Sequence, residues 1–210
     1  MRHVLSLCGV ALVLAACNTT PTKQAQKAPA PTPAEIQVEE SIGFTIVENG
    51  QIDGDVRVDY DRAHDLLKQG SLDDAIALLA TVGEQAPELS APRIDLAIAY
   101  HRRDDFDAAE KHLLQVLEIN PQHPIALNEI GIVYRKTARF TEARRSYEAA
   151  LAVYPGYHYA RRNLAVLCDL YLADLECAAD NYEAYMATVH SDEEAAMWLR
   201  AVKYRLGSTE

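Results

Sequence analysis

The sequence contains few basic residues. Its 20 lysines and arginines stand against 31 aspartates and glutamates among 210 residues, which gives a net charge of −11 at pH 7. Nucleic-acid binding depends on dense positive charge that neutralises phosphates, and anionic lipid headgroups attract clusters of lysine and arginine. The acidic balance therefore disfavours both kinds of partner and mainly favours solubility.

The common patterns of catalytic and cofactor sites are also missing. The chain has no Gly-rich phosphate loop, and it has no pair of histidines with a nearby acid at metal-site spacing. The acidic run at 104–107 lacks the central glycine and distal glutamate of a calcium loop, so we assign it to a turn. His101, His112 and His123 are expected at turns or facing solvent. The sequence thus predicts no enzyme activity, no cofactor and no metal.

The N-terminus has the features of an export signal. A short positive start is followed by a mostly apolar stretch at 4–14, too short for the roughly 20 residues with which a helix spans a bilayer. The segment 14–17, Leu-Ala-Ala-Cys, resembles the lipobox of bacterial lipoproteins. That resemblance implies removal of the signal peptide 1–16, diacylglycerol on the sulfur of Cys17, and an acyl chain such as palmitate on its new amine. The alternative is an ordinary signal peptide with an incidental cysteine.

The residue after this cysteine bears on the destination. In lipoprotein families an aspartate there tends to retain the protein in the inner membrane, whereas this chain has Asn18. The resemblance therefore implies a lipid anchor in the outer membrane, facing the periplasm. Several acyl chains on one residue give a stable anchor, whereas a single chain binds only marginally.

Two segments separate the lipobox from the rest of the chain. Residues 17–40 are rich in Thr, Pro, Ala, Gln and Lys, and we expect a lipid-anchored flexible linker. Residues 41–55 are expected to form either an extended arm or a β-hairpin. In the hairpin, the strand at 44–47 would turn at Asn49-Gly50 and return through 51–52.

Small residues recur every 34 positions in the remainder of the chain. Two alanine-rich series and one proline series share this period: Ala63, Ala97, Gly131 and Ala165; Ala75, Ala109 and Ala143; Pro87, Pro121 and Pro155. A 34-residue period predicts a solenoid of helix–turn–helix units, in which stacking buries the apolar face that one unit cannot bury alone. The prolines fall where helices must stop.

The repeat resembles the tetratricopeptide repeat family, most clearly in its third unit. The matching residues of that unit are Leu127, Ile130, Gly131, Tyr134, Phe140, Ala143, Tyr147, Ala150 and Pro155. The resemblance implies an all-α, right-handed superhelical solenoid. We expect helix–turn–helix units at 56–89, 90–123, 124–157 and 158–190, followed by a capping helix at 191–206. The fourth unit slips by one position, which indicates an extra residue in the turn near Asp174.

The C-terminal units carry two further features. Cys168 and Cys177 are expected on neighbouring helices of the fourth unit, either as a disulfide or as two buried thiols. Ser191 and Glu194 form a capping-box start for the final helix, on which Trp198 is expected to be a packing residue.

In the family, the first helix of each unit lines a concave groove. Carrying these positions over gives a mixed apolar, aromatic and basic set: Tyr60, His64, Lys68, Ile98, His101, Arg102, Asn128, Arg135, Lys136, Tyr159, Arg162 and Asn163. Our hypothesis is a groove for an acidic peptide or helix, held by Arg102, Arg135 and Arg162, because guanidinium groups pair with carboxylates. The alternative is a solvated face with intrahelical ion pairs. Ile94 and Ile98 stand where a chaperone-tail clamp has lysine and asparagine, so a chaperone-tail reader is not expected.

These observations predict a non-catalytic scaffold that binds a protein partner in the bacterial envelope. Its layout is similar to that of the pilotin-like lipoproteins that assist type IV pilus assembly, and fold alone does not fix the partner. The alternatives are a structural envelope spacer, a recruiter of cell-wall enzymes, and a ligand-binding or enzymatic pocket at the irregular fourth unit.

Overall fold

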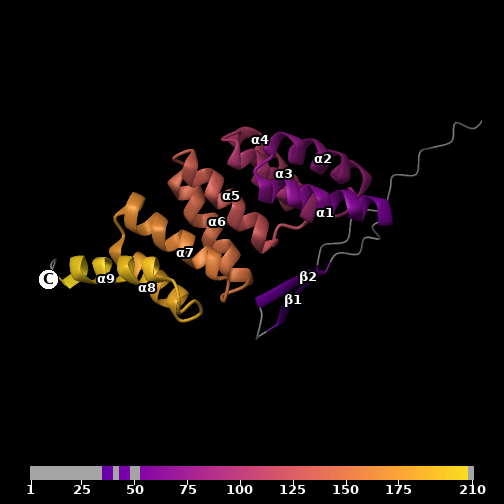
Figure 1. Cartoon of the computed structure of the whole chain (residues 1–210). Helices are drawn as coiled ribbons and strands as arrows, with labels where there is room; N and C mark the ends of the chain where they lie inside the picture. The colour runs from indigo at the N-terminus through magenta and orange to yellow at the C-terminus, as the bar shows by residue number, and fades with distance from the viewer. Residues whose placement is uncertain (1–34, 40–42, 48–52, 208–210) are drawn as a thin grey trace, which may run out of the picture. The chain divides into compact units, whose positions relative to one another are not determined.

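The computed structural model describes residues 35–39, 43–47 and 53–207, drawn in colour in Figure 1. The chain divides into a unit of residues 1–30 and a unit of residues 31–210, and all described residues belong to the second. The lipobox cysteine, Asn18 and the turn at Asn49-Gly50 lie outside the described residues. No described helix is both long enough and apolar enough to cross a membrane.

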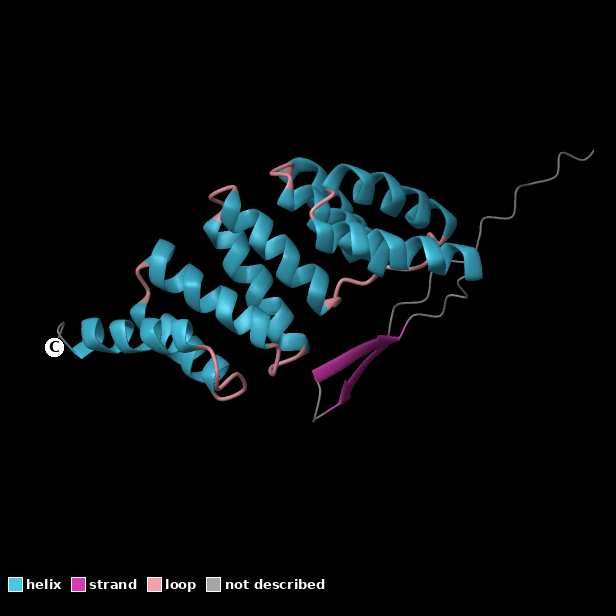
Figure 2. Cartoon of the chain, viewed as in Figure 1, coloured by secondary structure: helices cyan, strands magenta, loops and turns pink. Residues whose placement is uncertain are grey.

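Nine α-helices follow one another in the part of the chain from residue 53 to 207 (Figure 2). Each packs on the next along the chain, and the first helices of successive units also touch one another. The helices are α1 (Gly54–Gln69), α2 (Leu72–Gln85), α3 (Ala91–Arg102), α4 (Phe106–Ile119), α5 (Pro124–Lys136), α6 (Phe140–Val153), α7 (His158–Leu167), α8 (Leu175–Met186) and α9 (Glu193–Gly207). The predicted all-α helical repeat is confirmed, with α1–α2, α3–α4, α5–α6 and α7–α8 as its four units.

A β-hairpin precedes the helices, and its pairing differs from our expectation. Strand β2 (Gly43–Val47) pairs antiparallel with β1 (Glu35–Glu39), so Ile36 lies opposite Ile46. In the hairpin alternative, we had expected the strand at 44–47 to pair with the residues that follow it. The partner strand instead comes from the segment assigned to the linker, whose Glu-Ile-Gln-Val-Glu alternation is typical of a strand. The linker assignment was therefore too long at its C-terminal end.

The turns inside the units repeat with the same period. Gly70, Asp104 and Ala138 all have positive φ, at 79°, 61° and 59°, and each stands 34 residues from the next. In the fourth unit the corresponding residue is Ala173, one position late. A π-helical segment, Cys168–Leu172, precedes it. A π-turn places one more residue in a helical turn, so this segment absorbs the extra residue that the sequence predicted near Asp174.

The repeating small residues lie where helices approach most closely. Ala63, Ala97 and Ala165 are at most 1% exposed. In the third unit the same position is Gly131, and a Cβ there would lie 2.6 Å from Cε1 of the Tyr147 ring. Tyr147 is itself 0% exposed, so its ring occupies the space that a methyl group would need. In the third unit, glycine therefore leaves room for the ring of Tyr147.

This matching predicts a double-mutant effect. Gly131→Ala should destabilise the protein by about 1–3 kcal/mol, because the buried ring of Tyr147 must move. In a Tyr147→Leu background the same change should cost little, because the second unit already combines Ala97 with Leu113. Urea unfolding of the four proteins measures the coupling. Equal costs in both backgrounds would contradict the account.

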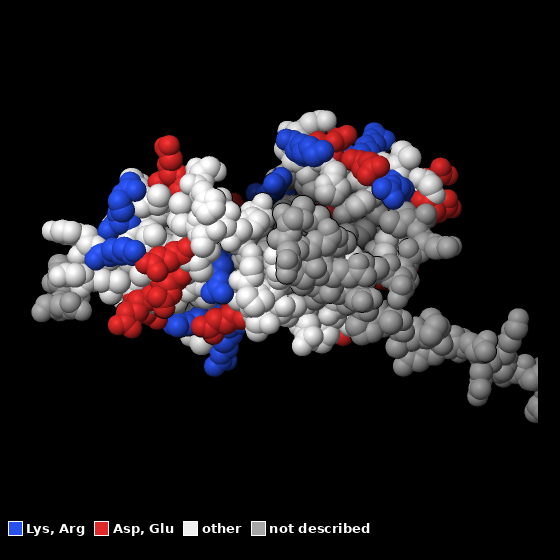
Figure 3. Space-filling view, turned by 90° about the horizontal axis from the view of Figure 1, so that it is seen from below, with Lys and Arg blue, Asp and Glu red and all other residues white. Residues whose placement is uncertain are grey.

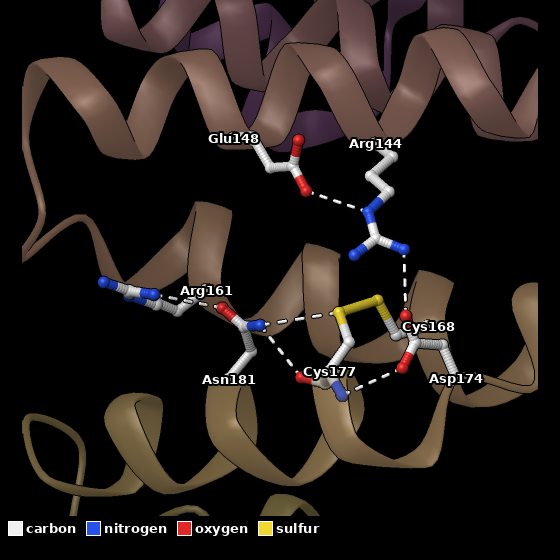
Figure 4. A network of polar contacts seen from close by, with 7 residues as sticks. All are labelled: Arg144, Glu148, Arg161, Cys168, Asp174, Cys177 and Asn181. Carbon is white, nitrogen blue, oxygen red and sulfur yellow. Dashed lines mark hydrogen bonds and ion pairs between the residues drawn. A yellow bond between two sulfur atoms is a disulfide. The ribbon is translucent and has the colours of Figure 1, made fainter.

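A polar network joins α6 of the third unit to the fourth unit, and a disulfide lies within the fourth unit (Figure 4). Asp174 accepts a hydrogen bond from the backbone of Cys177 at the start of α8, and its other oxygen lies 2.9 Å from Arg144 of α6. The backbone hydrogen bond and the Arg144 charge both lower the pKa of Asp174. Cys168 and Cys177 are joined by a disulfide, which staples the π-helical segment to α8.

We expect reduction of this disulfide to lower stability. The bridge spans a sequence separation of nine residues, and a loop of that size limits the unfolded chain enough to stabilise the fold by about 2–3 kcal/mol. A Cys168→Ser/Cys177→Ser variant should match the reduced wild-type protein in thermal unfolding and should not respond to dithiothreitol. If dithiothreitol still lowers the unfolding temperature of the double variant, the loss of stability has a cause other than this disulfide.

The final helix, predicted at 191–206, is Glu193–Gly207, and its cap lies one residue later than predicted. Asp192, rather than Ser191, caps it by accepting a hydrogen bond from the backbone of Ala195 at 2.9 Å. Asp192 also accepts one from the hydroxyl of Tyr185, at 2.8 Å, so its carboxylate joins α8 to α9. Trp198 is half-buried and packs at 6.0 Å from the ring of Tyr182, as expected of a packing residue.

Candidate partner-binding surface

The first helices of the units are α1, α3, α5 and α7, and polar contacts join α1 to α3 and α5 to α7. We call the side of these four helices that carries the predicted groove residues the first-helix face. Tyr60 of α1 donates to Asp95 of α3, and Asn163 of α7 donates to Asn128 of α5. The predicted groove residues are distributed over these four helices, of which α3 also packs against α5.

At the α1–α3 junction, three side chains form a compact group. The Tyr60 hydroxyl and His64 Nε2 both meet Oδ2 of Asp95, the latter at 2.9 Å. The rings of Tyr60 and His64 meet edge to face, with centroids 4.8 Å apart. The Asp95 side chain is only 16% exposed, so this carboxylate is held in a largely dry setting.

At the α5–α7 junction, two asparagine side chains form a hydrogen-bonded chain that ends on the carboxyl group of Glu129. Asn163 donates to Asn128 Oδ1 at 2.9 Å, and Asn128 donates to Glu129 Oε1 at 3.0 Å. Burial raises the pKa of Glu129 to about 7, with the charge of Asp95 adding to the rise and the Asn128 hydrogen bond and Arg102 opposing it. Asn128 is 2% exposed, which corrects our placement of it among the exposed groove residues. It instead supports Glu129.

The three arginines that we expected to hold a partner already have contacts within the chain. Arg102 donates to the backbone oxygen of Leu67 at 3.1 Å. The Arg135 guanidinium lies 5.8 Å from the centroid of the Tyr171 ring. The contacts of Arg162 are made with the final helix and its cap: Asp192 at 3.5 Å, Glu194 at 3.3 Å and the Trp198 ring at 5.0 Å. These contacts give Arg135 and Arg162 roles in packing the units.

The remaining predicted residues differ in exposure. Lys136 at the end of α5 and Tyr159 at the start of α7 are exposed, the latter by 60%. Lys68 is also exposed and forms an ion pair with Asp65 one turn earlier in α1. Ile98 is half-buried against the core of the second unit. His101 is half-buried too, and burial together with Lys136 and Arg135 lowers its pKa.

His123 was expected at a turn or facing solvent, and it is instead 1% exposed. Its Nδ1 accepts a hydrogen bond from the backbone of Ala126, which caps α5. Burial lowers the His123 pKa to about 4, so the ring is neutral and its proton is on Nε2. Nε2 lies 2.9 Å from the Ser90 hydroxyl, and a protonated nitrogen there cannot accept the serine proton. This Ser–His pair is therefore structural rather than a nucleophile and base.

The sequence interpretation missed an acidic row on the same helices. Asp61, Asp95 and Glu129 are spaced by 34 residues, and the basic residues Lys68, Arg102 and Lys136 follow each of them by seven. Seven residues are two turns of helix, or about 10 Å. The 34-residue period could have revealed this pattern, since both rows follow it. Figure 3 likewise shows acidic and basic side chains interspersed on the described surface.

One group of side chains among the described residues has the composition of a metal site. The ligand atoms of Cys168, Asp174 and Cys177 lie within 4.8 Å of one another. Both sulfurs are joined in the disulfide and Asp174 pairs with Arg144, so these groups are already used for structure.

The raised pKa of Glu129 predicts a pH-dependent stability. The folded protein holds this proton up to about pH 7, whereas the unfolded chain releases it near 4.5, so the contribution of Glu129 to stability falls as pH rises between these values. Glu129→Gln, which keeps the acceptor for Asn128, should therefore stabilise the fold by about 1–3 kcal/mol at pH 8.

The gain should disappear below about pH 4.5. Thermal unfolding from pH 4 to pH 8 measures it, with the exposed Glu118→Gln on α4 as the matched control. A gain that does not depend on pH, or an equal gain in the control, would show that Glu129 is not the cause.

Comparison with known families assigns the repeats. Two family models, both described as tetratricopeptide repeat, match residues 66–128 and 128–170. Together with the four helical units, these matches show that this is a tetratricopeptide repeat protein. Proteins built from such repeats generally mediate protein–protein interactions.

Curated relatives share only part of their length with this chain. Anaphase-promoting complex subunit CDC16 from Saccharomyces cerevisiae is 28% identical over 91 residues, which are 43% of this chain and 11% of that protein. The chain thus spans about a tenth of the length of the curated relatives that it matches.

Solved structures show the same fold at low identity. MamA from Desulfovibrio magneticus RS-1 superposes with a TM-score of 0.63 at 19% identity, covering 75% of this chain and 88% of that one. PilF from Pseudomonas aeruginosa gives 0.66 at 17%, covering 73% and 69%. The first repeat domain of Spaghetti (RPAP3), solved with an HSP90 peptide, gives 0.53 at 19%, covering 56% and 95%.

Proposed function

We propose that the protein is a non-catalytic scaffold that binds a segment of a partner protein on its first-helix face. The single observation that carries this proposal is that the first helices α1, α3, α5 and α7 contact one another in succession and keep charged and apolar side chains accessible at every unit. The Spaghetti structure was solved with a bound peptide, which supports the assignment of a peptide to such repeats.

The setting that we propose is the bacterial envelope. Cys17 carries the lipid, the chain faces the periplasm from the outer membrane, and the partner belongs to an envelope complex such as a pilus or secretion apparatus. The lipobox-like segment at 14–17 supports the anchor. The Cys168–Cys177 disulfide supports export, because disulfides persist in oxidising compartments such as the periplasm.

The test compares variants of two faces in partner capture. The lipidated protein is recovered from gently solubilised envelope of the source bacterium, and co-purifying proteins are identified by mass spectrometry. Lys136→Glu/Tyr159→Ala changes exposed residues of the first-helix face, whereas Lys111→Glu/Leu114→Ala makes the same kinds of change on the exposed surface of α4. Both should keep the wild-type unfolding temperature, since all four side chains are exposed.

We expect one envelope complex to be enriched at least tenfold with the wild type and the α4 variant, and lost with the first-helix variant. Cys17→Ser should abolish palmitate incorporation, whereas Cys8→Ser, within the signal peptide, should not. If both face variants recover the complex equally well, the binding site lies outside the first-helix face. If no complex is enriched with the wild type, the envelope-spacer alternative is favoured. Palmitate on the Cys17→Ser protein would refute the lipid anchor.

A further inference from the structure

A pocket of about 300 Å³ lies on the first-helix face beside the Tyr60–His64–Asp95 group. This volume is at the lower end of the range for small-molecule sites, so the pocket suits one inserted side chain better than a cofactor. Its lining includes Tyr60, His64, Ile94, Asp95, Ile98 and Ile125 from the helices. Ile46 of β2 also lines it.

The pocket combines a carboxylate with an aliphatic wall. Both hydrogen-bonded neighbours of Asp95, Tyr60 and His64, meet its Oδ2 atom, so neither of these contacts uses Oδ1. Ile94 and Ile98, on the same helix, contribute apolar surface beside that carboxylate. A negatively charged group at the edge of an apolar cavity is costly unless a cation pairs with it.

The charges around the pocket favour a cation at the acidic row. The charge of Asp95 contributes to the raised pKa of Glu129 on α5, so Asp95 supplies the negative charge at this level of the face while Glu129 holds its proton. Two basic groups lie nearby. Arg102, two helical turns along α3 from Asp95, donates a hydrogen bond to the backbone oxygen of Leu67, and His64 contacts Asp95 directly. A partner cation would therefore meet the carboxylate of Asp95, with the basic row about 10 Å away along the helices.

We propose that this pocket receives a lysine or arginine side chain from the bound segment, with its aliphatic stem against Ile94 and Ile98 and its cationic head at Asp95. The inference rests on the proposed function and specifies the partner chemistry at that face. Long basic side chains place their methylene groups on apolar surface and their charge on a polar partner, which is the combination that this pocket offers. Acidic side chains of the same segment would meet the basic row formed by Lys68, Arg102 and Lys136.

Three synthetic peptides test the charge preference on the full-length lipidated protein in detergent micelles. Each is a fluorescent twelve-residue peptide with an alanine–glycine background, carrying lysine, norleucine or glutamate at every third position. We expect the lysine peptide to bind at least tenfold more tightly than both others, by fluorescence anisotropy, and its affinity to fall as salt is added. Equal binding of the norleucine peptide, tighter binding of the glutamate peptide, or no lysine-peptide binding at millimolar protein would overturn the proposal.

Variants locate the binding. Asp95→Asn keeps an acceptor for the Tyr60 hydroxyl and should lower the affinity of the lysine peptide to that of the norleucine peptide. The exposed Asp107→Asn on α4 makes the same charge change and should have no effect. Ile98→Lys should also abolish lysine-peptide binding, because it supplies a competing cation. Unfolding temperatures identify any variant that fails to fold, and an unchanged affinity in a folded Asp95→Asn protein would refute the site.

Partner capture separates this inference from the proposed function. If the captured complex is lost with Lys136→Glu/Tyr159→Ala but retained with Asp95→Asn, the face binds the partner and the basic side-chain pocket is wrong. If all these variants retain the complex, the first-helix face is not the binding site and both proposals fail.

Discussion

The close approach of helices at one small residue per unit is the constraint on which the rest of the structure depends. Ala63, Ala97, Gly131 and Ala165 are nearly or fully buried, and they allow the helices of each unit to pack against one another. Tyr147 in the third unit shows how tight the limit is, because its ring occupies the space of a glycine Cβ. In the first three units, residues that are 34 positions apart occupy equivalent places, as the turn residues Gly70, Asp104 and Ala138 show.

This constraint explains why the helical units could be predicted from sequence. Small residues, prolines and turn positions share one period, and the late position of Ala173 follows from the π-helical segment before it. The hairpin pairing was not predicted, because a short alternating strand such as Glu35–Glu39 carries a weak signal inside a Pro-rich segment. The cap at Asp192 was missed because Ser191 offered an equally good capping sequence.

The candidate site was predicted less completely. The sequence identified the first helix of each unit, but it could not show which side chains there were already in use. Arg162 lies against Trp198 and the acids of the cap, and Asn128 turns inward to Glu129. Long polar side chains can reach several neighbours, so their contacts depend on the packed structure rather than on spacing. The spacing of Asp95 and Glu129 is visible in the sequence, but their hydrogen-bond partners and burial are known only from the structure.

Hydrogen–deuterium exchange on the partner-bound protein tests the central claim most directly, because it reports which helices the partner covers. Binding on the first-helix face predicts slower backbone exchange in α3 and α5 than in the free protein, together with unchanged exchange in α4 and α6. Protection confined to α4 and α6, or no protection in any described helix while the partner is bound, would contradict the account.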